Sequence, residues 1–303
     1  MLTSTARIFI LAALCLSAFP LTAQAETVYL TATKLVDPIE GKLRRNPLVT
    51  IIDDQITEVT FGSNAPADAK VIDLGDATLL PGLADMHTHL TYYSSDNGYE
   101  SLAVSYTDQA VRGVANARKT LMAGFTAARN LGAGGYSDVS LRDAIDSGRV
   151  PGPRLQVSGP SLGITGGHCD SNLLPEQYGV KAEGVADGPW AVRAKVREVN
   201  KYGADIIKFC ATGGVLSKGT SVGARQYTME EMQAIVDEAH TRGMTVAAHA
   251  HGTEGIRYAI QAGVDSIEHS SLIDDEGIKL AKEKGTWLSM NIYATEYLLA
   301  EGE

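Results

Sequence analysis

Two hydrophobic patterns follow one another along the chain. Residues 27–80 hold short runs of β-branched and apolar residues, separated by turns at Asp53-Asp54 and Gly75-Asp76. Runs of this kind predict short strands. From Ala84 onward, helical patterns alternate with apolar strand-like runs. The sequence therefore predicts a small β-sandwich-like unit over 26–82 and an α/β domain over 83–303.

A repeated phrase marks the junctions of the second domain. Each instance has a glycine followed by a β-rich run, as in "AGFTAAR", "YGADIIKF", "RGMTVAAH", "AGVDSIEH" and "KGTWLSM". Glycine just past a helix end adopts the left-handed conformation that closes the helix before the next strand. We expect strands near 84–89, 125–130, 154–159, 204–210, 245–250, 265–269 and 286–291.

Continuous apolar strands such as "DIIKFCA" suit a parallel sheet that is covered on both faces. A doubly wound sheet usually carries a glycine-rich phosphate turn after its first strand. Here the first strand ends in His-Thr-His, and polar residues recur at the ends of later strands, which favours a (β/α)8 TIM-type barrel. No eighth strand is found before Glu303. We therefore expect a fragment or truncated product, with its barrel and its small β-unit incomplete, that is poorly active or unstable alone.

The first 25 residues predict a cleavable secretory signal peptide. They contain Arg7, an apolar stretch and the small-residue ending Ala23-Gln24-Ala25, with cleavage expected after Ala25. A lipoprotein signal needs a small residue just before its cysteine, whereas Leu14 precedes Cys15 here. Secretion or a periplasmic location is expected, without a membrane anchor or later membrane span.

Composition narrows the class of partner. The chain has 36 acidic and 26 basic side chains and a net charge of -10, so nucleic acid is excluded as an expected partner. Whether the chain forms a homo-oligomer is left open. Only Cys169 and Cys210 remain after processing. Two cysteines do not make a disulfide scaffold, and we expect them to be unpaired.

Histidines recur at the predicted strand ends. His87 and His89 in "ADMHTHL" lie two residues apart, so in a strand both imidazoles face the same side. His249 and His251 end a later strand, and His269 ends the next. Imidazole is a common ligand for zinc and related ions, so the pattern predicts a metal site.

Lys208 lies in the apolar strand "IIKFCA", where a buried ammonium is costly. It could form a Schiff base, bind a substrate anion, or react with carbon dioxide to give a carbamate. A carbamate reverses the charge and offers two oxygens. The surrounding histidines favour this third alternative, in which Lys208 bridges two metal ions.

The ordered motifs "LLPGLADMHTHL", "GADIIKFCATGG", "VAAHAHG" and "SIEHSS" resemble the amidohydrolase superfamily, in its binuclear carboxylated-lysine branch. They are most similar to imidazolonepropionase-related secreted amidohydrolases, which include Xaa-Pro dipeptidase-like and ochratoxin-degrading enzymes. The resemblance implies two divalent metal ions, with zinc expected and manganese or cobalt left open. It implies the ligands His87 and His89 for one ion, His249 and His269 for the other, and Lys208 as a bridging N6-carboxylysine.

The resemblance also implies an activity. A hydroxide that bridges the metals would cleave the amide bond of a dipeptide or an N-acyl amino acid. In the family, an aspartate after strand 8 takes the proton from the attacking water and passes it to the leaving amine. No aspartate of this sequence lies at that position, since Asp265, Asp274 and Asp275 flank strand 6. Two alternatives stay open: a lactonase or phosphotriesterase that uses the same metal site, and an inactive truncated metal-binding fragment.

Other candidate residues lie around this site. His168 and His251 are expected to face the substrate, although both could be ordinary loop residues. His240 ends a helix, where an imidazole favours the helix dipole, so a structural role is expected. Lys218 and Arg225 could pair with a substrate carboxylate, but basic loop residues are usually solvated and neither is favoured.

Overall fold

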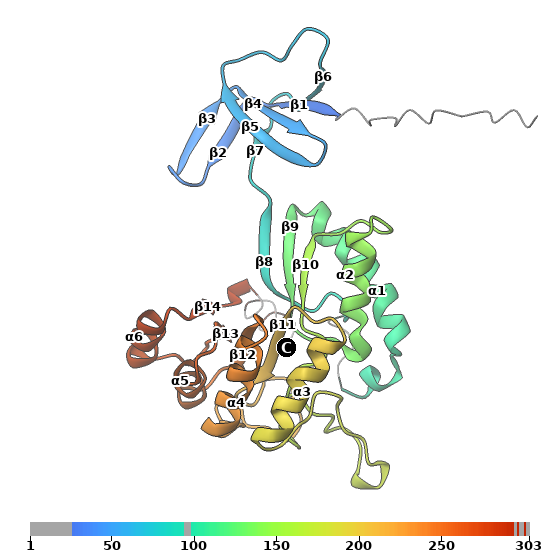
Figure 1. Cartoon of the computed structure of the whole chain (residues 1–303), viewed down its shortest axis with the longest axis vertical. Helices are drawn as coiled ribbons and strands as arrows, with labels where there is room; N and C mark the ends of the chain where they lie inside the picture. The colour runs from blue at the N-terminus through green and yellow to red at the C-terminus, as the bar shows by residue number, and fades with distance from the viewer. Residues whose placement is uncertain (1–25, 94–97, 294–295, 297–299, 301–303) are drawn as a thin grey trace, which may run out of the picture. The chain divides into compact units, whose positions relative to one another are not determined.

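The computed structural model describes residues 26–93, 98–293, 296 and 300. The chain divides into two compact units, Met1–Pro81 and Gly82–Glu303 (Figure 1). The predicted signal peptide lies outside the described residues. Among the described helices, none combines the length and apolar character that a membrane span requires.

The first unit contains two small sheets. One has the strand order β5-β4-β1-β6, and the other has the order β3-β2-β7. The strands are β1 (Thr27–Thr31), β2 (Lys34–Asp37), β3 (Lys42–Arg45), β4 (Pro47–Ile52), β5 (Gln55–Phe61), β6 (Lys70–Asp73) and β7 (Thr78–Leu79). Leu48 and Val49, which are adjacent in β4, are two of its few buried apolar side chains.

The second unit is built from parallel strands in chain order. They are β8 (Leu83–Thr88), β9 (Phe125–Asn130), β10 (Arg154–Val157), β11 (Ile206–Cys210), β12 (Thr245–Ala250), β13 (Ser266–His269) and β14 (Trp287–Ser289). Leu162, just beyond β10, joins the two groups of strands, because its backbone N–H donates to Lys208 O at 2.8 Å. This is the strand succession of a TIM-type barrel.

Helices alternate with these strands. They are α1 (Tyr106–Met122), α2 (Ser137–Asp146), α3 (Pro189–Lys201), α4 (Met229–His240), α5 (Thr253–Ala262) and α6 (Asp275–Lys284), with short 3-10 turns η1 (Gly98–Ala103), η2 (Gly134–Tyr136) and η3 (Glu176–Tyr178). In Figure 1, α3 and α4 lie outside β11 and β12. Their apolar faces, including Val192 and Val196, pack with Ile207 and Phe209 in the main core.

Strand alternation separates this core from the barrel interior. Ile207 and Phe209 of β11 belong to the core under the helices, whereas Ile206 packs with Leu131 and Ala247 in a separate small cluster. Lys208 alternates with Ile207 and Phe209, so it shares the interior face with Ile206. The sheet therefore buries a lysine on the face that the helices do not cover.

The predicted junction glycines are confirmed. Each one has a φ between 70° and 98°, in the left-handed region, at Gly124, Gly203, Gly243, Gly263 and Gly285. Strands 125–130 and 245–250 have the predicted bounds, and the others are shifted or shortened by one to three residues. Strand 286–291, for example, is limited to Trp287–Ser289.

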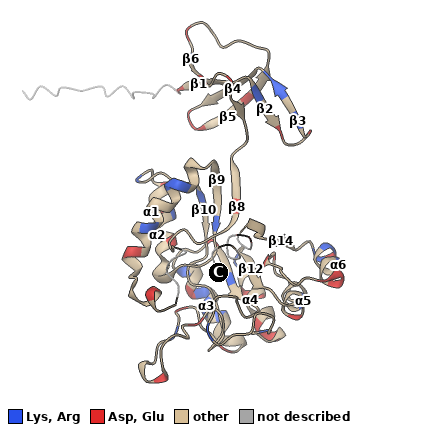
Figure 2. Cartoon of the chain, turned by 180° about the vertical axis from the view of Figure 1, so that it is seen from behind, with Lys and Arg blue, Asp and Glu red and all other residues tan. Residues whose placement is uncertain are grey.

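Helix ends carry the charges that complement the helix dipole. Helix α6 has Asp275 and Glu276 in its first turn and basic residues in its last turn, and Figure 2 shows both colours on it. At the end of α4, His240 Nε2 lies 2.8 Å from Asp265 Oδ2. This contact agrees with a structural role for His240.

The expectation that Cys169 and Cys210 are unpaired is wrong. They form a disulfide with a Cα–Cα distance of 6.0 Å. The segment after β10 turns back over the end of β11, as shown by the hydrogen bond from Cys210 N to Leu162 O at 2.9 Å. The sequence could not reveal this approach, since 41 residues separate the two cysteines.

Removing this cross-link should lower stability without changing the fold. We expect the Cys169→Ser/Cys210→Ser double variant to lose about 3–4 kcal/mol of unfolding free energy, the size expected for a loop of this length. Urea unfolding of the oxidised wild type and the variant measures the difference. A wild-type mass equal to that of the fully reduced chain would contradict the pairing.

Candidate metal centre

Six histidine rings form a continuous cluster at the carboxyl ends of the strands. Ring centroids are 4.2 Å apart for His168 and His249, and 4.8 Å apart for His87 and His269. The loops after β8 and β10 and the ends of β12 and β13 supply the other contacts. The cluster consists of His87, His89, His168, His249, His251 and His269.

His87 and His89 present their Nε2 atoms to each other. His87 Nδ1 lies 3.0 Å from Glu268 Oε2, and His89 Nδ1 lies 3.3 Å from Gly132 O. Both partners are acceptors, so each Nδ1 carries the proton and each Nε2 carries a lone pair. These Nε2 atoms are 3.3 Å apart. Two ligands of a tetrahedral zinc ion, with Zn–N bonds of about 2.0–2.1 Å, lie about 3.3 Å apart.

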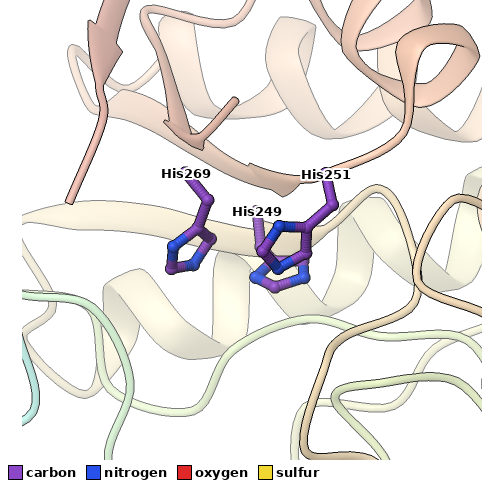
Figure 3. Close-up of side chains that lie close together, drawn as sticks. All are labelled: His249, His251 and His269. Atoms are coloured by element: carbon purple, nitrogen blue, oxygen red, sulfur yellow. The ribbon is translucent and has the colours of Figure 1, made fainter. Parts of the chain in front are cut away.

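A second group of histidines lies beside this pair. His249, His251 and His269 each offer a nitrogen, and these atoms lie within 4.8 Å of one another (Figure 3). His249 Nε2 faces Gly213 O at 3.2 Å, which leaves Nδ1 as its lone-pair atom. The predicted substrate-facing residue His251 thus lies in the same cluster as the predicted ligands His249 and His269.

An unusual backbone brings His269 into the cluster. In a regular strand Glu268 and His269 would face opposite sides. His269 has a φ of 74° and Ser270 a φ of 52°, both in the left-handed region. Both residues therefore reach His87: Glu268 through a hydrogen bond and His269 through a contact between the two rings. Such strain costs about 1–3 kcal/mol per residue and is concentrated at functional sites.

Glu268 and Arg129 form a buried network that the sequence analysis missed. Glu268 is fully buried and accepts hydrogen bonds from Arg129 Nη2 at 2.5 Å and Ser266 Oγ at 2.7 Å. Arg129 Nε also donates to Met86 O at 2.7 Å. The available signal was a glutamate inside the predicted parallel strand 265–269, where a buried charge needs a partner. The network holds the His87 ring and fixes its protonated nitrogen.

Lys208 lies in the barrel interior near all six histidines. Its side chain is nearly inaccessible, and its ammonium makes no hydrogen bond or ion pair with any residue that the structure describes. Burial, in spite of attraction by Glu268, lowers the pKa of Lys208 to about 8. The Lys208 amine is therefore a weaker base than an exposed lysine, and a larger minority of it carries a free lone pair near neutral pH.

The imidazoles are neutral. Burial, together with the Lys208 charge, lowers the pKa of His89 and of His168 to about 4. Burial and the neighbouring His87 lower the pKa of His269 to about 2, and burial places the pKa of His87 and His249 well below the ordinary value. Neutral imidazoles are the form that binds metal ions. The donor set, together with an unpartnered buried lysine, therefore fits divalent cations.

Two hollows adjoin the cluster. The first hollow, of about 730 Å³, reaches His89 and His168 and is lined by Tyr92, Tyr106, Leu102 and Val180. The second hollow, of about 330 Å³, is lined by His168, Asn172, Leu216, Ser217 and Lys218. His168 lies at the boundary of both, so a molecule in either hollow reaches the histidine cluster.

Other residues considered at the sequence level lie elsewhere. Asp274 caps helix α6 and pairs with Arg257, and Asp265 pairs with His240. Arg225 lies 3.7 Å from Glu254 and lines neither hollow. None of these side chains joins the described histidine cluster.

Replacing Glu268 tests the network. The Glu268→Gln variant removes the charge that fixes the protonated nitrogen of His87, so we expect zinc affinity to fall about 10- to 100-fold. Competition with a fluorescent chelator measures this. Glu238→Gln is the matched control, because Glu238 is a buried carboxylate on α4 that pairs with Arg193 and Arg197 of α3 and makes no contact with the described histidine cluster. Equal zinc affinity in Glu268→Gln and the wild type would contradict the role of Glu268.

Comparison with known proteins finds relatives that are similar in sequence and in structure. The chain is 36% identical over 276 residues to ochratoxinase of Aspergillus niger, across 83% of this chain and 56% of the relative. The chain thus spans a little over half the length of that curated relative. The structure of a Xaa-Pro dipeptidase with bound methionine matches with a TM-score of 0.82 and 38% identity, across 91% of this chain and 69% of that one.

The crystal structure of A. niger ochratoxinase matches with a TM-score of 0.81 and 31% identity, across 92% of this chain and 68% of the other. The family model for the amidohydrolase family matches residues 78–301, which include the whole histidine cluster and Lys208. Together with the barrel architecture, this match places the chain: it belongs to the amidohydrolase family.

Proposed function

We propose that the protein is a hydrolase of amide bonds that works with two divalent metal ions, zinc in the first instance. The observation that carries this proposal is the buried Lys208 ammonium, which has no described partner and is surrounded by neutral imidazoles. His87 and His89 would hold one ion and His249 and His269 the other.

Lys208 would bridge the two ions as a carbamate. The ammonium first loses one proton; the neutral amine nitrogen then forms a bond to the carbon of carbon dioxide, one C=O π bond becomes a C–O⁻ group, and the nitrogen loses a second proton. Two protons leave in all, which turns a cation into an anion with two oxygens. This change removes the unpaired buried ammonium and supplies the negative charge that two divalent ions require. Glu268, which holds His87, supplies the other buried carboxylate of the site.

When bound, the two ions would supply an activated water and polarise the carbonyl group that is attacked. The chain's own residues position the substrate. His168 lies between the two hollows and stacks on His249, so it is placed to hydrogen-bond the amide beside the ions. His251 Nδ1 lies 2.8 Å from Ser271 Oγ, and its ring centroid lies 4.7 Å from that of His249. Both are proposed to contact the substrate.

The relatives support an amide between an acyl group and an amino acid. Ochratoxinase and the Xaa-Pro dipeptidase are named for substrates with such a bond. We therefore propose N-acyl amino acids or dipeptides as the substrate class. The Cys169–Cys210 disulfide suits an oxidising compartment, which supports the proposal that residues 1–25 direct secretion.

Metal content tests the bridging role of Lys208. We expect about two zinc ions per wild-type chain and at most one in Lys208→Ala, because the bridging carbamate is lost. Plasma emission spectrometry on dialysed protein measures the ratio. His240→Ala is the matched control, since His240 lies outside the cluster and should not change the metal content. Two ions per chain in Lys208→Ala would exclude the bridge.

Substrate chemistry is tested by side-by-side rates on an N-acyl amino acid, a lactone and an aryl phosphotriester. We expect the amide to be cleaved with the highest kcat/KM, and His168→Ala to lower that value by about 10- to 100-fold through loss of a hydrogen bond to the reacting amide. A chelator should abolish the rate, and added zinc should restore it. A faster lactone or phosphotriester would favour those activities, and bound zinc without any turnover would favour a metal-binding role.

A further inference from the structure

The two hollows are neighbours. They share six lining residues, of which His168 belongs to the histidine cluster: Ser101, Leu102, His168, Asp170, Ser171 and Ala182. A substrate whose amide lies at His168 therefore extends one group into the first hollow and the other into the second. The chemistry of each hollow indicates which group it takes.

The first hollow suits an apolar group. Aromatic and aliphatic side chains line it, and its charged groups are engaged within the chain. Asp170 accepts three backbone N–H groups, and Glu183 accepts the N–H of Gly135 at 2.8 Å. Lys181 lies 3.6 Å from Asp187. Each ionic side chain among the described lining of this hollow thus already has a partner within the chain.

The second hollow is lined by a lysine that makes no ion pair with any described residue. Lys218 lines it, and in the described part of the chain its ammonium has no ion-pair partner. The preceding residue, Ser217, is hydrogen-bonded to His168 Nδ1. Gly214 lies so close to His168 that a Cβ there would stand 2.2 Å from Cε1 of the ring. The loop after β11 is thus fitted to His168, and Lys218 lines the same hollow as His168.

Arg225, the other basic residue of this region, is already occupied. Its guanidinium lies 3.7 Å from Glu254 and 4.1 Å from the centroid of the Tyr258 ring, and it lines neither hollow. The structure therefore distinguishes Lys218 from Arg225 as partners for a substrate carboxylate, which the sequence could not do. Lys218 is the one that faces the substrate space.

We propose that Lys218 recognises the carboxylate of an N-acyl amino acid while the N-acyl group occupies the first hollow. This inference rests on the proposed amide hydrolysis. The chain carries a net charge of -10, so an anionic substrate is repelled at long range and needs a local cation at the site. Lys218 supplies that cation one residue from the side chain that holds His168.

Binding of a ligand that cannot be cleaved tests the proposal without requiring turnover. N-tosyl-L-phenylalanine and its carboxamide have nearly the same shape and differ in one charge, and their sulfonamide bond resists hydrolysis. Calorimetry on the zinc-loaded full chain measures both dissociation constants. We expect the acid to bind about fivefold more tightly than the amide in the wild type, and about equally in Lys218→Gln.

Two matched variants complete the design. Lys181→Gln and Arg225→Gln each remove one nearby positive charge that is already paired, so both should keep the wild-type preference for the acid. An unchanged preference in Lys218→Gln, or an equal loss in Arg225→Gln, would overturn the assignment, as would a wild type that binds neither compound. Absence of amide hydrolysis together with a Lys218-dependent preference would instead refute the proposed function and leave the binding site in place.

Discussion

The site depends on one constraint, which is a lysine amine buried where the chain offers it no described partner. An unpaired ammonium in a protein interior costs several kcal/mol. The fold accepts this cost on the interior face of β11, where neutral imidazoles lie around Lys208 and the nearby Glu268 carboxylate is already paired with Arg129. Neutral imidazoles cannot compensate the charge, but they can bind cations. In the proposed function the lysine becomes an anion, and the arrangement is then most favourable when metal and carbamate are present together.

The Glu268 and Arg129 pair shows how the site is held before any ion binds. Their ion pair satisfies both charges inside the barrel, and the second carboxylate oxygen remains for His87. The orientation of His87 therefore does not depend on the metal. His89 is held in the same way by Gly132 O, where a Cβ would approach the His89 ring to 3.2 Å. The proposed ligands His87 and His89 are preorganised by contacts from β9, its loop and β13.

The sequence revealed the parts of this site that depend on local pattern. A histidine at a strand end and a lysine inside an apolar strand can be located from alternation alone, and the parallel order of strands brings them together. The Glu268–Arg129 pair, the Cys169–Cys210 disulfide and the hollow beside Lys218 could not be found in this way. Each one joins segments that are far apart in sequence, and a distance between such segments follows from packing rather than from pattern. The left-handed backbone at His269 was also hidden, because a histidine carries no signal of positive φ.

The separation of the hydrophobic core from the chemistry explains how such a polar interior is tolerated. The main core lies between the strands and the helices, where Ile207 and Phe209 pack on α3 and α4, while the apolar cluster inside the barrel consists of Leu131, Ile206 and Ala247. Burial of apolar area at the outer layer supplies most of the stabilisation at roughly 25 cal/mol per Å². The interior face at the strand ends contributes little to that total. Histidines, a lysine and a strained backbone can therefore accumulate there at a cost that the outer layer offsets, which is why one rim of the strands carries the whole site.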